Sequence, residues 1–181
     1  MNNFKPRPCS KLTSVLIFFC LLISGILQSQ SSEEYTIVKT NSGNVKIPGQ
    51  WQKLNTEEDS GQTFFVNSEK VIFAVAQNAK KAYPFFTVGK KNFEYVKDFY
   101  TWDSDYMIEN NFKTSKIKEN PKQEYIIWKY NAGKLDNLFL FGSNKEAFLN
   151  LLVYTDKWSE NEKILFLEKI YILNKYDVRA K

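Results

Sequence analysis

The stretch that most constrains the fold lies in the last third of the chain, where two apolar segments flank a polar turn between Asn137 and Thr155. Residues 138–141 and 148–153 show almost no alternation of apolar and polar side chains, which is typical of strands covered by protein on both faces. We therefore expect a hairpin at the centre of a sheet. Asn150 is the one polar residue inside the second segment, and we interpret it as facing a strand end or bonding locally rather than as a site.

The residues after this hairpin predict a helix over about 159–173. Ser159 and Glu162 have the Ser-x-x-Glu spacing of a capping box, which satisfies free backbone N–H groups at a helix start. Ile164, Leu167 and Tyr171 belong to a wide apolar face that has to be buried. We expect this helix to pack across the sheet.

A second helix is predicted over about residues 92–110, with Asn92 as its cap. Aromatic residues recur there at spacings of four, three and four: Tyr95, Phe99, Trp102 and Tyr106. Such a stripe is typical of a helix face in the core. Asn110-Asn111 is suited to a left-handed stop.

Further strands are indicated by alternating or β-branched segments between turn residues. They are residues 35–39, 45–47, 63–67, 71–77, 113–119 and 124–130. Residues 71–77 are apolar on both faces and predict a covered strand, whereas residues 113–119 predict an exposed one. Trp51 follows Pro48-Gly49 and is expected to close one end of the core.

The first 29 residues have the parts of a secretory signal. Lys5, Arg7 and Lys11 form the basic start, and residues 12–27 form an apolar stretch that is short for a bilayer span. We predict export, with cleavage after Ser29 and a single domain over residues 30–181. An uncleaved anchor is the weaker alternative.

Both cysteines, Cys9 and Cys20, fall in this segment, so the exported domain is expected to contain no disulfide. Bulky Phe18 and Phe19 precede Cys20, where a lipidation site requires small residues. Without the three basic residues of the segment, 22 basic residues face 20 acidic ones. That balance gives no electrostatic support for nucleic-acid binding.

The sequence lacks histidine, which excludes imidazole bases and histidine metal sites. We also find no phosphate-binding glycine loop and no serine elbow, and we expect neither a cofactor nor a metal. Asp103-Ser104-Asp105 is a weak match to a calcium loop, because Met107 occupies the next ligand position. Paired carboxylates remain the open route to an enzyme, a hydrolase, although nothing in the sequence selects a pair.

Residues 79–91 combine lysines with aromatic residues around Pro84, which prevents a continuous helix. The candidate partner-binding residues are Lys80, Lys81, Tyr83, Phe85, Phe86, Lys90 and Lys91. Basic residues beside aromatic ones suit an anionic partner or a membrane surface. The favoured interpretation has the phenylalanines in the core and the lysines in solvent.

Three local features give the chain a resemblance to a known family: Ile47-Pro48-Gly49-Gln50-Trp51, the strand pair around Phe141-Gly142-Ser143, and the closing Ile172-Leu173-Asn174. With the order of elements, they resemble the PsbP-like family, whose fold includes Ran-binding import factors and DcrB-like envelope proteins. The resemblance implies an α+β fold, an α/β/α sandwich with a mainly antiparallel sheet of about six to eight strands between two main helices. It also implies an assembly factor, chaperone or binding subunit with no shared catalytic residues.

These observations favour an exported, non-catalytic binding or accessory protein of a bacterial envelope, whose partner is another envelope or exported protein. The abundance of lysine, asparagine, isoleucine, phenylalanine and tyrosine is typical of an AT-rich, bacterial genome. The alternatives are a carboxylate-dependent hydrolase and a protein that docks on a membrane surface through residues 80–91. The partner and the oligomeric state stay unassigned.

Overall fold

The structure is a computed structural model that describes residues 34–133 and 135–176. The chain divides into two units, Met1–Glu33 and Glu34–Lys181. The expected signal segment therefore lies outside the described residues. Within the described ranges, no helix has both the length and the apolar character needed to cross a membrane.

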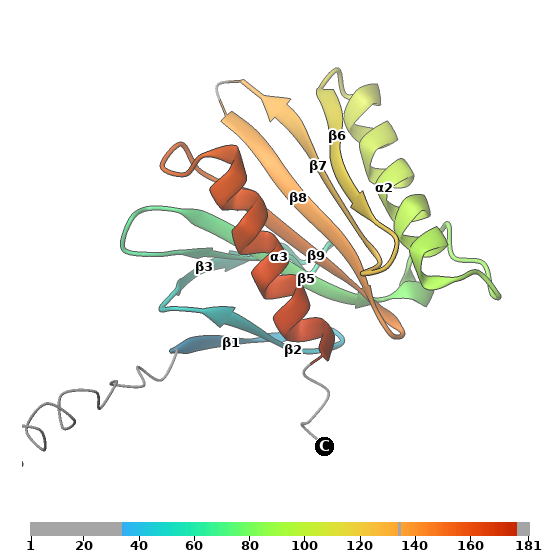
Figure 1. Ribbon diagram of the computed structural model, residues 1–181, viewed down its shortest axis with the longest axis horizontal. Coiled ribbons are helices and arrows are strands. Elements are labelled where there is room, and N and C mark those ends of the chain that lie inside the picture. The colour runs from blue at the N-terminus through green and yellow to red at the C-terminus, as the bar shows by residue number, and fades with distance from the viewer. Residues whose placement is uncertain (1–33, 134, 177–181) are drawn as a thin grey trace, which may run out of the picture. The chain divides into compact units, whose positions relative to one another are not determined.

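A seven-stranded antiparallel sheet forms the middle layer of the second unit (Figure 1). Its strands are β3 (Gln52–Thr56), β4 (Thr63–Val66), β5 (Ile72–Ala79), β6 (Lys113–Asn120), β7 (Tyr125–Ala132), β8 (Leu135–Asn144) and β9 (Ala147–Tyr154). They lie side by side in the order β3-β4-β5-β9-β8-β7-β6. The predicted apolar hairpin is β8-β9, and β9 is the central strand of the sheet, as expected.

One helix covers each face of this sheet (Figure 1). The first, α2 (Asn92–Glu109), packs on β6, β7 and β8, and the second, α3 (Glu160–Tyr176), packs on β8 and β9 across the other face. A separate two-stranded sheet of β1 (Tyr35–Thr40) and β2 (Gly43–Pro48) lies beside α3. The predicted α+β fold with an antiparallel sheet between two helices is confirmed.

The α3 layer is fixed by the interactions that the sequence predicts. The Glu162 carboxylate accepts hydrogen bonds from the Ser159 backbone N–H and hydroxyl, both at 2.7 Å, so the capping box is present. Leu167, Ile170 and Tyr171 are buried against the sheet. The side chain of Asn174 bonds both backbone groups of Lys46, which attaches the small hairpin to the helix.

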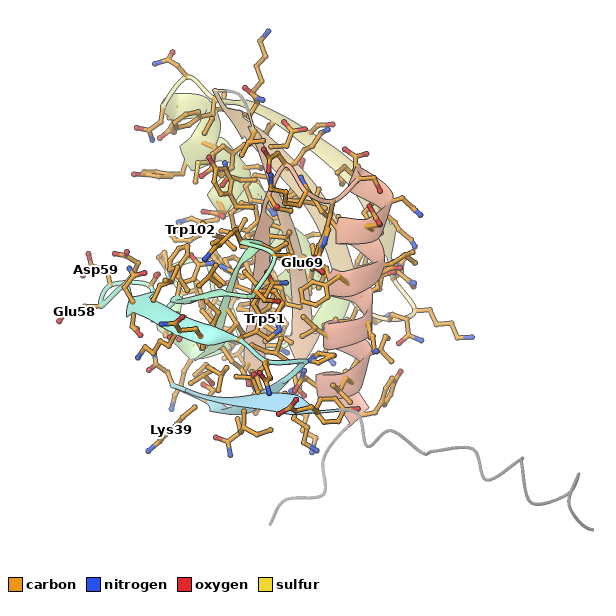
Figure 2. The ribbon with its side chains drawn as sticks, turned by 90° about the vertical axis from the view of Figure 1, so that its left-hand side faces the viewer. Lys39, Trp51, Glu58, Asp59, Glu69 and Trp102 are labelled. Carbon is orange, nitrogen blue, oxygen red and sulfur yellow. The ribbon has the colours of Figure 1, made fainter. Side chains whose placement is uncertain are left out.

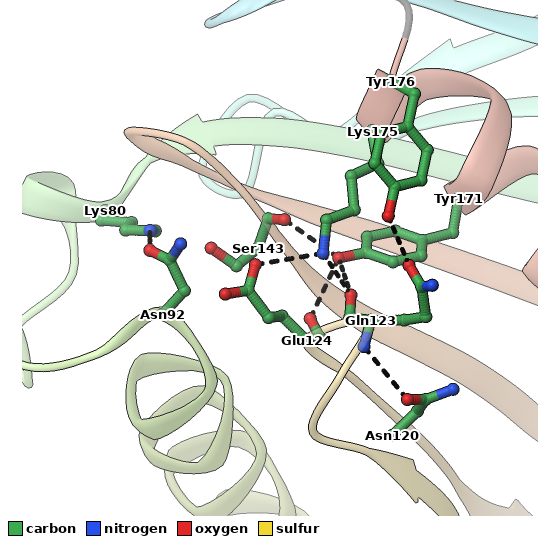
Figure 3. Close-up of polar contacts among 9 residues, drawn as sticks. All are labelled: Lys80, Asn92, Asn120, Gln123, Glu124, Ser143, Tyr171, Lys175 and Tyr176. Carbon is green, nitrogen blue, oxygen red and sulfur yellow. Dashed lines mark hydrogen bonds and ion pairs between the residues drawn. The ribbon is translucent and has the colours of Figure 1, made fainter.

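Tyr171 connects the end of α3 to the turn between β6 and β7 (Figure 3). Its hydroxyl lies 2.7 to 3.0 Å from the backbone carbonyls of Gln123, Glu124 and Ser143. Its ring lies over Gly142, where an added Cβ would approach a ring carbon to 2.1 Å. Because any other side chain would collide with this ring, glycine is required at position 142 by packing.

The α2 layer departs from its prediction in one respect. Tyr95 and Phe99 are buried, and Phe99 stacks on Phe141 with ring centroids 4.0 Å apart. Trp102 and Tyr106, however, are 44% and 58% exposed, so the aromatic stripe is core only in the first half of the helix. The helix packs mainly on β6, β7 and β8, the ring of Phe99 also lies 4.9 Å from the ring of Phe148 on β9, and Trp102 lines an open space beside this contact.

Two smaller differences concern the strands and caps. The edge strand β3 was not predicted, because all five of its residues are exposed and show no alternation. Asn92 is not the cap of α2, because its side-chain oxygen accepts a hydrogen bond from Lys80 Nζ at 2.8 Å (Figure 3). The Glu94 carboxylate instead accepts a hydrogen bond from the Lys91 backbone N–H at 3.0 Å. The left-handed stop is confirmed at Asn111, whose φ is 64°.

Candidate functional site

A cavity of about 770 Å³ lies between the second half of α2 and the face of the sheet that α2 leaves uncovered. Its floor is formed by residues of β4, β5, β8 and β9, and its rim by the loops around Ser42, Ser60 and Tyr83. Cavities of this size are typical of small-molecule sites.

The strand β5 contributes to the cavity only at its end. In its middle, Ala74 and Ala76 pair with Leu152 and Asn150 of β9, and both alanines are buried and do not line the cavity. Asn78 and Ala79, at the end of the strand, do line it. The cavity therefore lies over the end of β5 and beside the second half of α2.

Six aromatic residues line the cavity: Phe64, Tyr83, Phe99, Trp102, Tyr130 and Phe139. These rings pack on one another: the ring centroid of Tyr83 lies 4.9 Å from that of Phe99 and 5.9 Å from that of Trp102, which it contacts edge-on. Trp102 and the loop that carries Asp59 lie on the side of the molecule away from α3 (Figure 2). A wall of ordered rings favours a ligand with an apolar or cationic part.

Polar side chains are fixed at the rim. The Asn78 amide donates to the backbone carbonyl of Ser60 at 2.8 Å and to the Tyr83 hydroxyl at 3.3 Å, and its oxygen accepts from Asn41 at 2.8 Å. Gly61 turns the chain here with φ of 67°, and an added Cβ would lie 2.5 Å from the Asn41 amide nitrogen. The rim is therefore shaped by hydrogen bonds and by a glycine with positive φ.

Two buried polar atoms of the lining have no hydrogen-bond partner among the described residues: Gln62 Nε2 and Asn150 Oδ1. Buried polar groups are normally paired, and each unpaired one calls for an explanation, of which a bound water or ligand is one. Asn137, also in the lining, is 8% exposed. The floor thus presents amide groups next to aromatic rings.

Asp103 of α2 brings a carboxylate into the same cavity. Burial away from water raises the pKa of this carboxyl to about 6, and desolvation is the sole cause of the shift. Within the described part of the chain, no side chain forms an ion pair or hydrogen bond with it. Burial raises the pKa of the Tyr83 and Tyr130 hydroxyls. The negative charge of the nearby Asp103 carboxylate raises both pKa values further.

Asn150 corrects an expectation. It does not face a strand end, because it lies in the central strand, paired with Ala76 on one side and Phe141 on the other, and its oxygen makes no local bond. The signal was visible in the sequence as a polar residue inside an apolar segment. Asp103 had no such signal, since a carboxylate on a helix is ordinary until its surroundings are known.

The residues of 80–91 that were expected to bind a partner lie in different environments. Lys80 does not belong to any exposed surface: it is 4% exposed, burial lowers its pKa, and its ammonium lies over the rings of Tyr95 and Phe148. Lys81, Lys90 and Lys91 are exposed, and Lys90 pairs with Asp98 at 2.7 Å.

The aromatic residues of that segment are half-buried and face inwards, in agreement with the favoured interpretation of the phenylalanines. Phe85 stacks on Phe99, and Phe86 stacks on Tyr95. Tyr83 belongs to the wall of the cavity. The expected residues are therefore not gathered into one site, and Tyr83 alone contributes to the cavity.

The cavity also contains a second carboxylate, Asp59, which is exposed at the rim. In the part of the chain that the structure describes, no group of three or more acidic residues could hold a metal ion. No protein-family model matches the sequence, and a comparison with curated proteins found no significant match. The chemistry of the cavity is therefore the basis for a functional proposal.

Proposed function

We propose that this protein is a non-catalytic binding protein that holds a small organic molecule in the cavity between α2 and the sheet. One observation carries the proposal: the cavity of about 770 Å³ combines an aromatic wall with buried polar atoms that have no partner among the described residues. A hydrophobic wall with a few placed polar groups is the usual composition of a ligand site.

The cellular setting is proposed from the sequence. The residues of 1–29 support export, and the order of elements that resembles the PsbP-like family supports an accessory role beside another envelope or exported protein. Binding a ligand in the cavity is compatible with such a role, because the rim loops and Trp102 are open to solvent and can present a bound molecule to a partner.

The test is a fragment screen on the domain of residues 30–181, read by NMR from the indole N–H of Trp102 and the side-chain amides of Gln62 and Asn150. Binders are expected to shift these signals together. The variant Asn150→Phe fills the floor and is expected to abolish the shifts, whereas Asn55→Phe, on an exposed edge strand, retains them. A screen in which no compound shifts these groups contradicts the proposal.

A second candidate is a carboxylate-dependent hydrolase, which is favoured by the presence of both Asp59 and Asp103 in one cavity. A carboxyl with a pKa of about 6 is suited to donate a proton near neutral pH. Neither carboxylate is oriented by a hydrogen bond from another described side chain, and catalysis needs fixed geometry. Turnover of nitrophenyl glycosides that is lost in Asp103→Asn would favour the hydrolase over the binding protein.

The third alternative, docking on a membrane surface, has less support. Phe85 and Phe86 are held by α2, so the apolar contact would come from Val88, which is 85% exposed beside Lys90 and Lys91. A single valine is a weak anchor compared with two phenylalanines. Sedimentation with anionic vesicles that is lost in Val88→Ser would favour this alternative.

A further inference from the structure

We infer that the cavity selects a small organic cation, an amine or quaternary ammonium group carried on an apolar or aromatic body, an inference that rests on the proposed function. The carboxylate of Asp103 lies in a cavity lined by aromatic rings and by no basic residue of the described chain. Charge complementarity therefore favours a ligand with a positively charged group.

The charge balance of the site carries the first step. Burying a carboxylate without a counter-ion or hydrogen bonds opposes folding, so such groups are normally paired. Elsewhere in the described chain the carboxylates near lysines are paired, as in Lys129 with Asp136 and Lys175 with Glu124. Asp103 has no such neighbour, and Asp59 at the rim adds a second negative charge. A ligand ammonium would supply the counter-ion.

The aromatic wall carries the second step. The faces of tryptophan and tyrosine attract ammonium groups, and cages of such rings recognise choline and methylated lysine. Four lysines lie over rings in the described residues, and the five rings they use are those of Phe93, Tyr95, Tyr100, Phe148 and Tyr171. None of these rings lines the cavity. Trp102, Tyr83 and Tyr130 are thus left without a cation beside an unpaired carboxylate.

Other ligand classes fit less well. An anion would meet two carboxylates and no basic side chain, so it would be repelled. A neutral sugar could stack on Trp102 and bond the amides of Asn137 and Asn150, but it would leave Asp103 without a counter-ion. An ammonium on an apolar body satisfies the carboxylate, the rings and the amides together.

Binding of this kind depends on pH. Asp103 lies close enough to Tyr83 and Tyr130 for its charge to raise the pKa of both hydroxyls, and Asp59 lies at the rim, so the two tyrosines stay neutral in the range where Asp103 titrates. Asp103 has a pKa of about 6, and an ammonium binds its ionised form. Affinity for the cation is therefore expected to fall about tenfold from pH 7 to pH 5.

The experiment is calorimetry of the domain of residues 30–181 with three probes that share one body: 2-phenylethylamine, 2-phenylethanol and phenylacetate. The amine is expected to bind at least about tenfold more tightly than the alcohol at pH 7, and phenylacetate more weakly than both. Asp103→Asn is expected to remove this preference. Asp105→Asn, an exposed carboxylate of the same helix outside the cavity, retains it.

The outcomes separate the inference from the proposed function. If the alcohol or a methyl glucoside binds as tightly as the amine, or if Asp103→Asn keeps the preference, selection of a cation is wrong while the cavity remains a ligand site. If all three probes are silent but neutral fragments shift the Trp102 and Asn150 signals, the cation is also wrong and the ligand site stands. If the fragment screen is silent as well, the proposed function itself fails.

Discussion

Removing the charge of Asp103 should stabilise the protein. A carboxyl whose pKa rises from 3.8 to about 6 on folding disfavours the folded state whenever it is ionised. This rise in pKa corresponds to about 3 kcal/mol, and solvent at the mouth of the cavity reduces the cost to about 2 kcal/mol. Asp103→Asn keeps the shape of the side chain without the charge, so this free energy of unfolding is regained.

The gain has a defined pH dependence. Below about pH 3 the carboxyl is mostly protonated in both states, and the substitution changes little. Between about pH 3 and pH 7 the unfolded chain releases its proton before the folded protein does, so the stability contributed at this site by the natural residue falls as pH rises. Above about pH 7 the carboxyl is ionised in both states, so the loss is complete and the advantage of the variant is constant.

Urea unfolding at pH 4 and pH 7.5 measures this effect. At pH 7.5 the midpoint of Asp103→Asn should lie about 1 M higher than that of the natural protein, and at pH 4 most of this difference should be gone. Asp105→Asn, whose carboxylate is exposed, is the matched control and should show no such difference. A variant that is equally stable or less stable at pH 7.5, or one whose advantage is the same at both pH values, refutes the account of the buried carboxylate.

Two further predictions concern the α3 layer. Gly142→Ala should lower the free energy of unfolding by about 3 kcal/mol, because the new Cβ would overlap the Tyr171 ring. The losses caused by Gly142→Ala and Tyr171→Ala should be far from additive in the double variant. Additive losses in chemical denaturation would contradict the packing of the ring on Gly142. Ser159→Ala should cost about 1 kcal/mol by removing the cap of α3, and an unchanged thermal midpoint would show that the cap does not contribute.

The fold was predictable where one pattern determined one environment. The uninterrupted apolar runs of β8 and β9 require cover on both faces, and the Ser159–Glu162 spacing marks the start of α3, so the centre of the sheet and its helix followed from sequence. The edge strand β3 could not be predicted, because its pairing with β4 depends on backbone groups and its side chains all face solvent.

The site was less predictable, because the cavity depends on space that no side chain fills. The stripe on α2 indicated a buried Trp102, but the cover of that ring depends on where the helix lies on the sheet, and Trp102 lines a cavity and is 44% exposed. The environment of Asp103 depends on the same space. Periodicity identifies the face of a helix, and the partner of that face is a property of the fold.

Asp103 also links stability to binding. An unpaired carboxylate lowers stability in the free protein, and a counter-ion brought by a ligand would restore it. Proteins commonly retain such locally unfavourable groups at functional sites. Stabilisation by the amine should therefore be larger in the natural protein than in Asp103→Asn.

The most direct measurement is a crystal structure of the domain of residues 30–181 with 2-phenylethylamine bound. The account predicts the ammonium nitrogen within about 4 Å of the Asp103 carboxylate, beside the face of Trp102, with the phenyl ring against Phe64 or Phe139. A cavity without the amine, or an amine bound at the surface while the cavity contains only water, would contradict it.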